Sequence, residues 1–370
     1  MTSCLNVMDF GAAGDGVTDD VPAFNAMIAQ ALSGGTRRCY MPTGKYRVSA
    51  PININDQLHL FGDYGTTEIL PDPTVSGVNI YTERAVKLSD FTIRYPVQGQ
   101  EGTQGVVVGC ANVGVGKYGN ALSVFRDLIL VNTRVGMAFN NASVFVADNI
   151  TSVNHSYTGI IVQNTYWPDA GDSKIVNCYL QGGNQVPGPG VVLPYSGITW
   201  TGNGACNISH NAILNHRYGV NIYPQDPALV PGQSAMRQLF ICGNTIDGAS
   251  IAAVSLYPQG NGTLGGVLIS DNILNLAHYG LSVPATPYGN WVKSLMFSNN
   301  NWHDDGQPGA ILGAIDGVET FVCIGTLGEA TGPSTQGWRI GNGVSGVLAV
   351  GASRGPFTVP NVLPSTLRVL

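Results

Sequence analysis

Short segments of alternating hydrophobic and polar residues recur along the chain at intervals of 21 to 37 residues. Six-residue segments that begin at 208, 241, 269 and 297 share one frame, in which the fourth residue is Asn211, Asn244, Asn272 or Asn300. Segments at 146–151, 175–180, 125–130 and 88–93 extend this frame with Asn149, Cys178, Leu128 and Phe91. Such recurrence predicts a solenoid of about eight coils. We interpret the asparagines as a buried ladder that satisfies turn backbone groups.

A second kind of strand follows the first one after a short turn. It occupies residues 135–139, 158–162, 218–222, 252–256 and 279–283. Apolar residues alternate within these segments, so every other side chain is expected to face inward. A glycine near the start of most of them allows the chain to bend.

One segment among the first fifty residues follows a helical pattern instead. Apolar residues recur at i, i+3, i+4 and i+7, namely at Phe24, Met27, Ile28 and Ala31, which predicts one apolar helix face. We predict that Thr18 caps this helix and that Asp19 and Asp20 lie in its first turn, near the positive end of the helix dipole.

The run before this helix contains glycines in the order G-x-x-G-x-G, which is not the dinucleotide-binding order. Its pattern is V-x-D-F-G-A-x-G-D-G-x-T-D-D, and after the helix comes Y-M-P-x-G-x-Y. These motifs resemble the N-terminal cap of the pectate-lyase-like superfamily of right-handed parallel β-helices. That superfamily includes polysaccharide lyases, glycosidases, epimerases and phage tailspikes. The match covers about residues 6–70 and implies a fold, not a reaction.

We therefore expect an all-β protein, a right-handed single-stranded parallel β-helix with an N-terminal capping helix and a β-rich C-terminal segment. The expected parts are a cap at 1–50, the β-helix at 51–318, and a C-terminal cap or association segment at 319–370. Tailspikes of this kind form homotrimers, so the resemblance implies a homotrimer.

The composition limits the kinds of molecule that the chain is expected to bind. Charged residues make up 11% of the chain, against roughly 25% in an average soluble domain. The net charge is −6 and no cluster of Lys and Arg is larger than Arg37-Arg38, which argues against nucleic acid as a partner. No apolar run approaches the length of a membrane span, and the first residues lack the pattern of a signal peptide. We expect synthesis in the cytoplasm, followed by virion association or release by lysis.

The residue before the frame position forms a first candidate column. In chain order it is Asp90, Asp127, Asp148, Asn177, His210, Gly243, Asp271 and Asn299. Neighbouring coils are about 4.8 Å apart, so consecutive aspartates would repel and raise the pKa of at least one of them, as a general acid requires. Capping of the turns by Asp and Asn side chains is the alternative.

The turn before the second strand forms another candidate column, with His155 and Tyr157, His216, Arg217 and Tyr218, and His278 and Tyr279. An arginine binds the carboxylate of a uronate, and a His or Tyr takes the proton at C5. Tyrosines that merely pack the turn edge are the alternative.

Long insertions follow the second strand at 163–174, 223–236, 257–266 and 284–291. Insertions on one face of a solenoid commonly build the binding surface, and these combine aromatic rings with acids, as sugar chains require. The predicted catalytic residues are Asp169, Asp172, Asp226 and His216. The predicted substrate-binding residues are Tyr166, Trp167, Arg217, Tyr223, Tyr288 and Trp291.

No His and Cys set has zinc spacing, so we expect no cofactor. The segment 301–307, with His303, Asp304 and Asp305, leaves a calcium ion open without a motif to support it. The leading hypothesis is a tailspike-like depolymerase that cleaves a bacterial surface polysaccharide by acid/base hydrolysis. A polysaccharide lyase or uronate epimerase that acts by C5 proton abstraction is one alternative. A non-catalytic glycan-binding spike or adhesin is the other.

Overall fold

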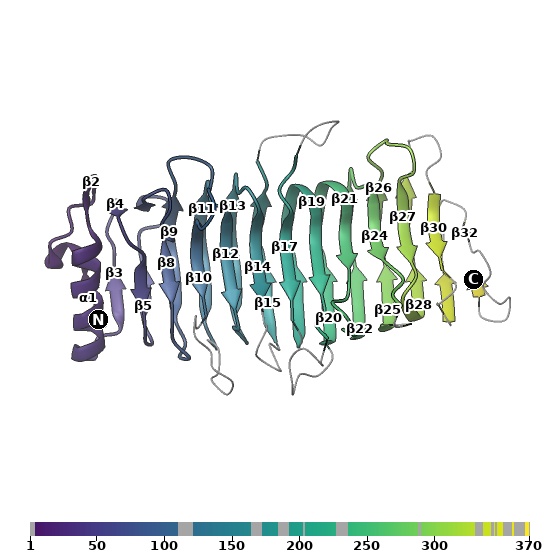
Figure 1. The fold of residues 1–370 in the computed structure, drawn as a ribbon, viewed down its shortest axis with the longest axis horizontal. Helices are drawn as coiled ribbons and strands as arrows, with labels where there is room; N and C mark the ends of the chain where they lie inside the picture. The colour runs from purple at the N-terminus through teal and green to yellow at the C-terminus, as the bar shows by residue number, and fades with distance from the viewer. Residues whose placement is uncertain are drawn as a thin grey trace. The chain divides into compact units, whose positions relative to one another are not determined.

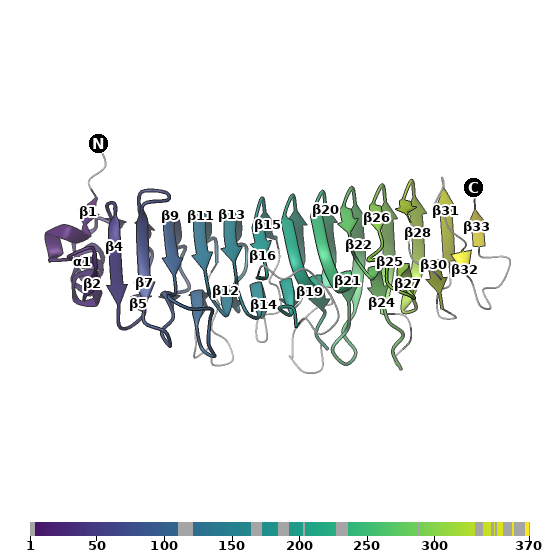
Figure 2. The ribbon, with the colours of Figure 1, turned by 90° about the horizontal axis from the view of Figure 1, so that it is seen from above.

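The computed structural model describes residues 4–109, 121–163, 172–183, 192–202, 204–226, 236–287, 289, 291–329, 336–341, 344, 346–350, 357–358 and 367–369. The chain divides into two units. Unit 1 comprises Met1–Trp167 and Ser173–Gly183, and unit 2 comprises Pro168–Asp172 and Asn184–Leu370. In each unit the strands pair in parallel with those of the coils before and after (Figure 1; Figure 2). The predicted all-β fold, a parallel β-helix, is confirmed.

Unit 1 has three strand columns, which we call its first, second and third sheets. The first contains β1 (Leu5–Asn6), β3 (Arg38–Tyr40), β6 (His59–Phe61), the first parts of β9 (Lys87–Arg94), β11 (Val124–Val131) and β13 (Val146–Val153), and β15 (Ser173–Val176). The second contains β2 (Asp15–Asp19), β4 (Gly44–Val48), β7 (Thr67–Pro71), the later parts of β9, β11 and β13, and β16 (Tyr179–Gln181). The third contains β5 (Ile52–Ile54), β8 (Val78–Ile80), β10 (Gln104–Val108), β12 (Val135–Asn140) and β14 (Thr158–Gln163).

Unit 2 repeats the arrangement. Its first sheet contains β18 (Ala205–Ser209), β20 (Met236–Cys242), β22 (Leu264–Ser270), β25 (Val292–Ser298), β28 (Val318–Ile324), β31 (Gly346–Val350) and β33 (Leu367–Val369). Its second sheet contains the first parts of β19 (Ala212–Tyr223) and β21 (Thr245–Leu256), then β23 (Ile273–Asn275), β26 (Asn301–His303) and β29 (Leu327–Glu329). Its third sheet contains β17 (Ser196–Thr201), the later parts of β19 and β21, β24 (Tyr279–Val283), β27 (Ile311–Ile315), β30 (Gln336–Ile340) and β32 (Phe357–Thr358). Parallel pairing crosses residues 50 and 318, so the pairing itself does not mark the predicted part boundaries.

The N-terminal helix α1 (Val21–Gly34) buries the predicted apolar face, Phe24, Met27, Ile28 and Ala31, and contacts the 3-10 helix η1 (Val7–Phe10), β1, β3 and β5. Its N-cap is Asp20, so the prediction of Thr18 is wrong, because Asp15–Asp19 form β2. The Asp20 carboxylate instead accepts the N–H groups of Ala13 at 2.6 Å and Gly14 at 3.3 Å. The aspartates of the opening run thus fix its glycine-rich turns.

The interior of unit 2 contains the predicted asparagine ladder. The Nδ2 of each asparagine donates to the Oδ1 of the next, at 2.9, 2.9 and 2.8 Å from Asn211 through Asn244 and Asn272 to Asn300. The same Oδ1 atoms accept the backbone N–H of the preceding asparagine, and the ladder residues are at most 2% exposed. Their predicted structural role is confirmed.

Asn149 does not belong to a buried ladder. Arg126 pairs with Asp148 and Leu128 with Ile150, so Ile150 takes the inward position and Asn149 lies exposed in the turn. The prediction shifted this segment by one residue because VADNIT has two consecutive polar residues that could occupy the frame position.

Glycine is needed where the third-sheet strand begins. A Cβ on Gly219 would lie 2.3 Å from Ile246 Cγ2 and 2.6 Å from the carbonyl oxygen of Ala253. These distances leave no space for a side chain, so the coil closes tightly there. Among the described residues, no helix is long and apolar enough to span a membrane.

Candidate functional site

The first candidate column is a set of left-handed turns. The backbone φ is positive at Asp90, Asp127, Asn149 and Asn177 in unit 1, and at His210, Gly243, Asp271 and Asn299 in unit 2. Asp, Asn and Gly tolerate this conformation best. Asn149 Nδ2 donates to Asp127 Oδ1 at 2.7 Å, and Asn299 Nδ2 to Asp271 Oδ1 at 3.3 Å. The column therefore has the structural role given by the alternative interpretation.

Asp148 contradicts the prediction of a repelling aspartate column. It lies outside the column of positive φ, and its carboxylate accepts Asn177 Nδ2 at 2.9 Å and Arg126 Nη2 at 2.6 Å. Partial burial favours the neutral acid, but these hydrogen bonds and the charge of Arg126 outweigh it, so the pKa of Asp148 lies below its usual value. Asp148 is therefore ionised at neutral pH and is no general acid.

The structure describes only some of the loop residues predicted for catalysis and substrate binding. Tyr166, Trp167, Asp169 and Tyr288 lie outside the described residues. Trp291 is 2% exposed and its Nε1 donates to the carbonyl of Pro284 at 3.1 Å. The expectation that Trp291 presents an exposed ring is wrong, because the ring packs inward against Gly317.

The remaining predicted site residues have different surroundings. The Asp226 carboxylate is 8% exposed and accepts the N–H of Asn261 at 3.0 Å, which connects two loops of neighbouring coils. Asp172 is exposed and has φ 60°. The predicted base His216 is 1% exposed, so it does not reach a polymer on the surface.

Arg217 and Tyr223 come together on the outer face of the third sheet of unit 2. Between them lies Tyr195, whose hydroxyl contacts that of Tyr223 and whose ring carries the Arg217 guanidinium 5.9 Å from its centroid. Asn221 Nδ2 donates to both hydroxyls, at 3.2 Å to Tyr195 and 2.7 Å to Tyr223. Tyr218 meets the Tyr195 ring edge-on at 5.4 Å, and Tyr257 lies 6.2 Å from Tyr223. We call these residues, with Arg217, the tyrosine face.

Tyr218 and Tyr223 stay protonated at neutral pH. Burial raises the pKa of Tyr218, with a smaller contribution from Tyr195, although Arg217 opposes it. Burial and the hydrogen bond with Tyr195 also raise the pKa of Tyr223. Phenols in this state donate hydrogen bonds or protons and do not act as bases.

A histidine paired with a carboxylate also lies in unit 2. His278 Nδ1 is 3.2 and 3.4 Å from the two carboxylate oxygens of Asp305, and its ring meets Tyr279 edge-on at 5.0 Å. The His278 and Asp305 side chains are 24% and 15% exposed, so solvent reaches the pair. A carboxylate at Nδ1 fixes the tautomer in which Nε2 accepts a proton.

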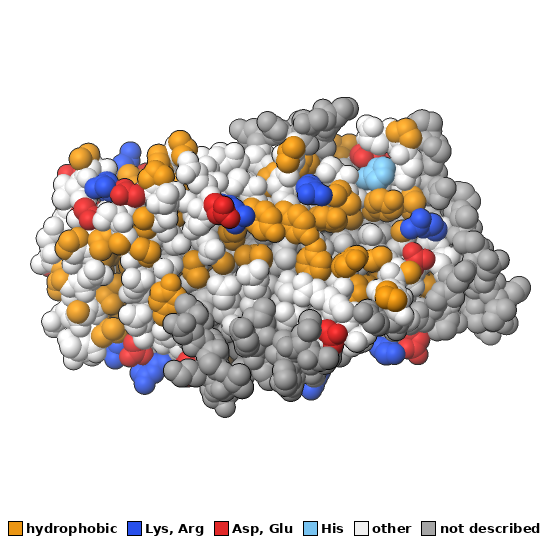
Figure 3. Space-filling view, in the orientation of Figure 1, with side chains coloured by type: hydrophobic (Ala, Val, Ile, Leu, Met, Phe, Trp, Pro, Cys, Tyr) orange, Lys and Arg blue, Asp and Glu red, His pale blue; other side chains and the backbone are white. Residues whose placement is uncertain are grey.

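The strand pairing of the third sheet shows how far the His278–Asp305 pair lies from the tyrosine face. Tyr218 pairs with Ala252 and Ala252 with Tyr279, so Tyr218 and Tyr279 are two strands apart, about 10 Å. Figure 3 shows the surface over β19, β21 and β24 as a band of hydrophobic side chains with few charged groups. An arginine, protonated phenols and a carboxylate-oriented imidazole thus share one face.

Sequence reasoning missed Tyr195 and the pairing of His278 with Asp305. The segment Y-S-G at 195–197 repeats the Tyr-Gly pattern of 218–219 and 279–280 with one residue inserted, which is a usable signal. Within the described part of the chain, no group of three or more His, Cys, Asp and Glu side chains could hold a metal ion.

Comparison with known proteins found two kinds of similarity, one in the sequence of the N-terminal segment and one in the fold. Residues 4–74 match the family described as rhamnogalacturonase A/epimerase, pectate lyase-like. A segment of 64 residues is 42% identical to mannuronan C5-epimerase AlgE2 of Azotobacter vinelandii, and it makes up 15% of this chain and 6% of the epimerase. The resemblance to the pectate-lyase-like superfamily is confirmed for this segment.

Solved structures extend the likeness along the chain. The Agl-KA catalytic domain superimposes with a TM-score of 0.65 at 14% identity, over 94% of this chain and 69% of that domain. PfbA, a surface adhesin of Streptococcus pneumoniae, superimposes with a TM-score of 0.61 at 14% identity, over 94% of this chain and 90% of the adhesin. These likenesses concern the parallel β-helix fold.

Proposed function

We propose that this chain acts on an acidic polysaccharide and that unit 2 removes the proton at C5 of a uronate, as an epimerase or a lyase does. The observation that carries the proposal is the His278–Asp305 pair on the face that presents Arg217. A mannuronan C5-epimerase is among the proteins that share the N-terminal segment, which agrees with an acidic polysaccharide as substrate although the segment itself lies outside this face.

Each group has one role in this reaction. The Arg217 guanidinium pairs with the uronate carboxylate and stabilises the charge that develops when C5 loses its proton. His278, oriented by Asp305, accepts that proton at Nε2. A tyrosine, Tyr218 or Tyr279, returns a proton to C5 from the other side or protonates the leaving oxygen at C4. The first outcome is epimerisation and the second is elimination.

Hydrolysis remains a prediction from the sequence. It requires two carboxyl groups about 5 Å apart, or about 6.5–9.5 Å apart for inversion. Among the described acids of this face, Asp226 holds a loop and Asp305 holds His278, so neither is half of such a pair. The tailspike-like assignment, virion association and the homotrimer also remain predictions, and light scattering tests the last of these against the 38.8 kDa monomer.

Incubation with polymannuronate, polygalacturonate and a neutral glucan tests the proposal. We expect inverted C5 centres by NMR, or unsaturated chain ends by ultraviolet absorbance, with a polyuronate only. His278→Asn should lower kcat about 100-fold or more, because a general base contributes that much. His210→Asn is the matched control, since His210 is an exposed turn residue. New reducing ends without unsaturation would indicate hydrolysis, and binding without turnover would indicate an adhesin; either result would refute the proposal.

A further inference from the structure

A cavity of about 230 Å³ lies on the outer face of the first sheet of unit 1. Its floor is a row of residues in register on neighbouring coils: Arg38 pairs with His59, His59 with Lys87, and Lys87 with Val124. Arg37 and Leu122 also line it. The row places three nitrogen-bearing side chains about 4.8 Å apart along the face.

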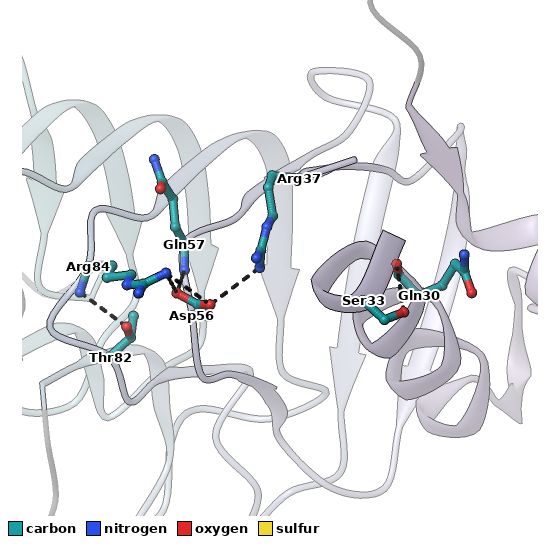
Figure 4. A network of polar contacts seen from close by, with 7 residues as sticks. All are labelled: Gln30, Ser33, Arg37, Asp56, Gln57, Thr82 and Arg84. Atoms are coloured by element: carbon teal, nitrogen blue, oxygen red, sulfur yellow. Dashed lines mark hydrogen bonds and ion pairs between the residues drawn. The ribbon is translucent and has the colours of Figure 1, made fainter. Parts of the chain in front are cut away.

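The charge of this cavity is positive although the chain carries a net charge of −6. Arg37, Arg38 and Lys87 line it, and no acid is among the described residues that do. The Asp56 carboxylate lies 3.4 Å from Arg37 and 3.1 Å from Arg84. Figure 4 shows Asp56 between the two guanidinium groups. One carboxylate shared by two arginines leaves an excess of positive charge beside the cavity.

A second cavity of unit 1, of about 370 Å³, provides a contrast. There Arg47 forms two hydrogen bonds with Asp72, at 3.0 and 2.9 Å, and Arg94 pairs with Glu68 at 3.2 Å. Its arginines are therefore neutralised within the protein. In the first cavity Lys87 is exposed and has no acid partner among the described residues, and the Arg38 guanidinium lies 5.1 Å from the centre of the Phe61 ring.

His59 is a neutral hydrogen-bonding group at the centre of the row. Burial, with the charges of Lys87 and Arg38, lowers its pKa to about 4, against the opposing charge of Asp90. Its Nε2 lies 3.1 Å from Ser89 Oγ, which orients the ring. The imidazole therefore adds no charge at neutral pH, and an anion bound beside it would raise its pKa.

One wall of the cavity is apolar. Leu122 is 66% exposed and has a φ of 59°, in the left-handed region that a leucine rarely adopts. Strained residues of this kind cluster at ligand sites. Val124, next to Lys87 in the row, adds a second aliphatic side chain to the lining.

We propose that this cavity binds an anionic saccharide unit. Arg38 and Lys87 hold its carboxylate or phosphate, and Leu122 and Val124 pack against the apolar face of its ring. A small inorganic anion would leave the aliphatic wall unused, and a neutral sugar would leave the cations unused. The site lies in unit 1 and requires no catalysis, so it stands independently of the proposed function of unit 2.

Calorimetric titration of the full chain with D-glucuronate, glucose 6-phosphate, glucose and inorganic phosphate tests the proposal. We expect at least one charged sugar to bind more tightly than both glucose and phosphate, and the two charged sugars distinguish a carboxylate site from a phosphate site. Lys87→Gln should weaken that binding about tenfold, the usual value of one charged hydrogen bond. Lys45→Gln, an exposed lysine at the second cavity, is the charge-matched control and should bind like the wild type.

NMR titration of His59 provides a second readout. Both the bound sugar and Lys87→Gln should raise its pKa, because the first adds a negative charge and the second removes a positive one. The proposal is overturned if neither charged sugar binds, if glucose or phosphate binds as tightly, or if Lys45→Gln weakens binding as much as Lys87→Gln.

Discussion

Asparagine side chains bond from one coil to a neighbouring coil at two kinds of position: the ladder of unit 2 lies inside the coil, whereas Asn149 of unit 1 lies outside it. Asn272 is 1% exposed and bonds to two asparagines and a carbonyl. Asn149 is exposed and donates one bond to Asp127. A buried polar group that loses its partner cannot turn to water, whereas an exposed one can. Burial, more than hydrogen-bond length, therefore decides how much each asparagine contributes.

The largest effect is expected inside unit 2. Asn272→Ala removes the acceptor of the Asn244 N–H and of Asn244 Nδ2, and leaves the carbonyl of Ile241 without this donor. These buried groups have no water to replace it, so we expect the free energy of unfolding to fall by about 4 kcal/mol. Urea denaturation measures this, and a loss below about 1 kcal/mol would contradict the buried ladder.

A buried histidine of unit 1 makes the stability of the protein depend on pH. His155 is fully buried, and burial lowers its pKa from 6.5 to about 3, with its Nδ1 3.1 Å from Ser152 Oγ. Because the folded pKa lies below the unfolded value, its contribution to stability is complete above pH 6.5 and is lost as the pH falls toward 3. We expect about 3 kcal/mol of acid destabilisation by pH 4.

His155→Leu should flatten this pH dependence, measured by denaturation at several pH values. His210→Asn, at an exposed turn, should leave it unchanged. An unaltered slope in His155→Leu would show that other groups cause the acid sensitivity.

The smallest effect is expected at the exposed turns of unit 1. Asn149→Gly keeps the left-handed φ of 55° accessible and removes only the bond to Asp127. Since water replaces that bond, the free energy of unfolding should change by less than about 0.5 kcal/mol. A loss of unfolding free energy comparable to that of Asn272→Ala, measured in the same urea titration, would show that the exposed turn residues contribute as much to stability as the buried ladder.

The fold was predictable where the pattern allowed one register. Asn211 and Asn272 recur with apolar neighbours on both sides, and Phe24 and Met27 fit one helix face, so their positions followed from periodicity. Asn149 did not, because Asp148 precedes it and either residue could occupy the frame position. The short second-sheet strands of unit 2 were not predicted as separate strands, since β23 and β26 are only three residues long and show no periodicity.

The site was less predictable because it depends on side-chain direction in turns and loops. Arg217 was chosen for its chemistry and is exposed, whereas the adjacent His216 is buried, and no pattern in the sequence separates them. Trp291 turns inward because Gly317 leaves space for it, and that contact joins residues 26 positions apart. The approach of Asp305 to His278 likewise depends on the path of a loop.

Deuterium exchange tests the central claim most directly. The full chain is incubated with a polyuronate in D₂O, and incorporation at C5 is followed by NMR and mass spectrometry. Proton abstraction by His278 predicts C5 deuteration if epimerisation follows, or unsaturated chain ends if elimination follows, with the wild type and with Asp271→Asn. Both signals should be lost in His278→Asn and Asp305→Asn. Either signal persisting in both His278→Asn and Asp305→Asn, or neither signal from the wild type with any polyuronate, would contradict the assignment.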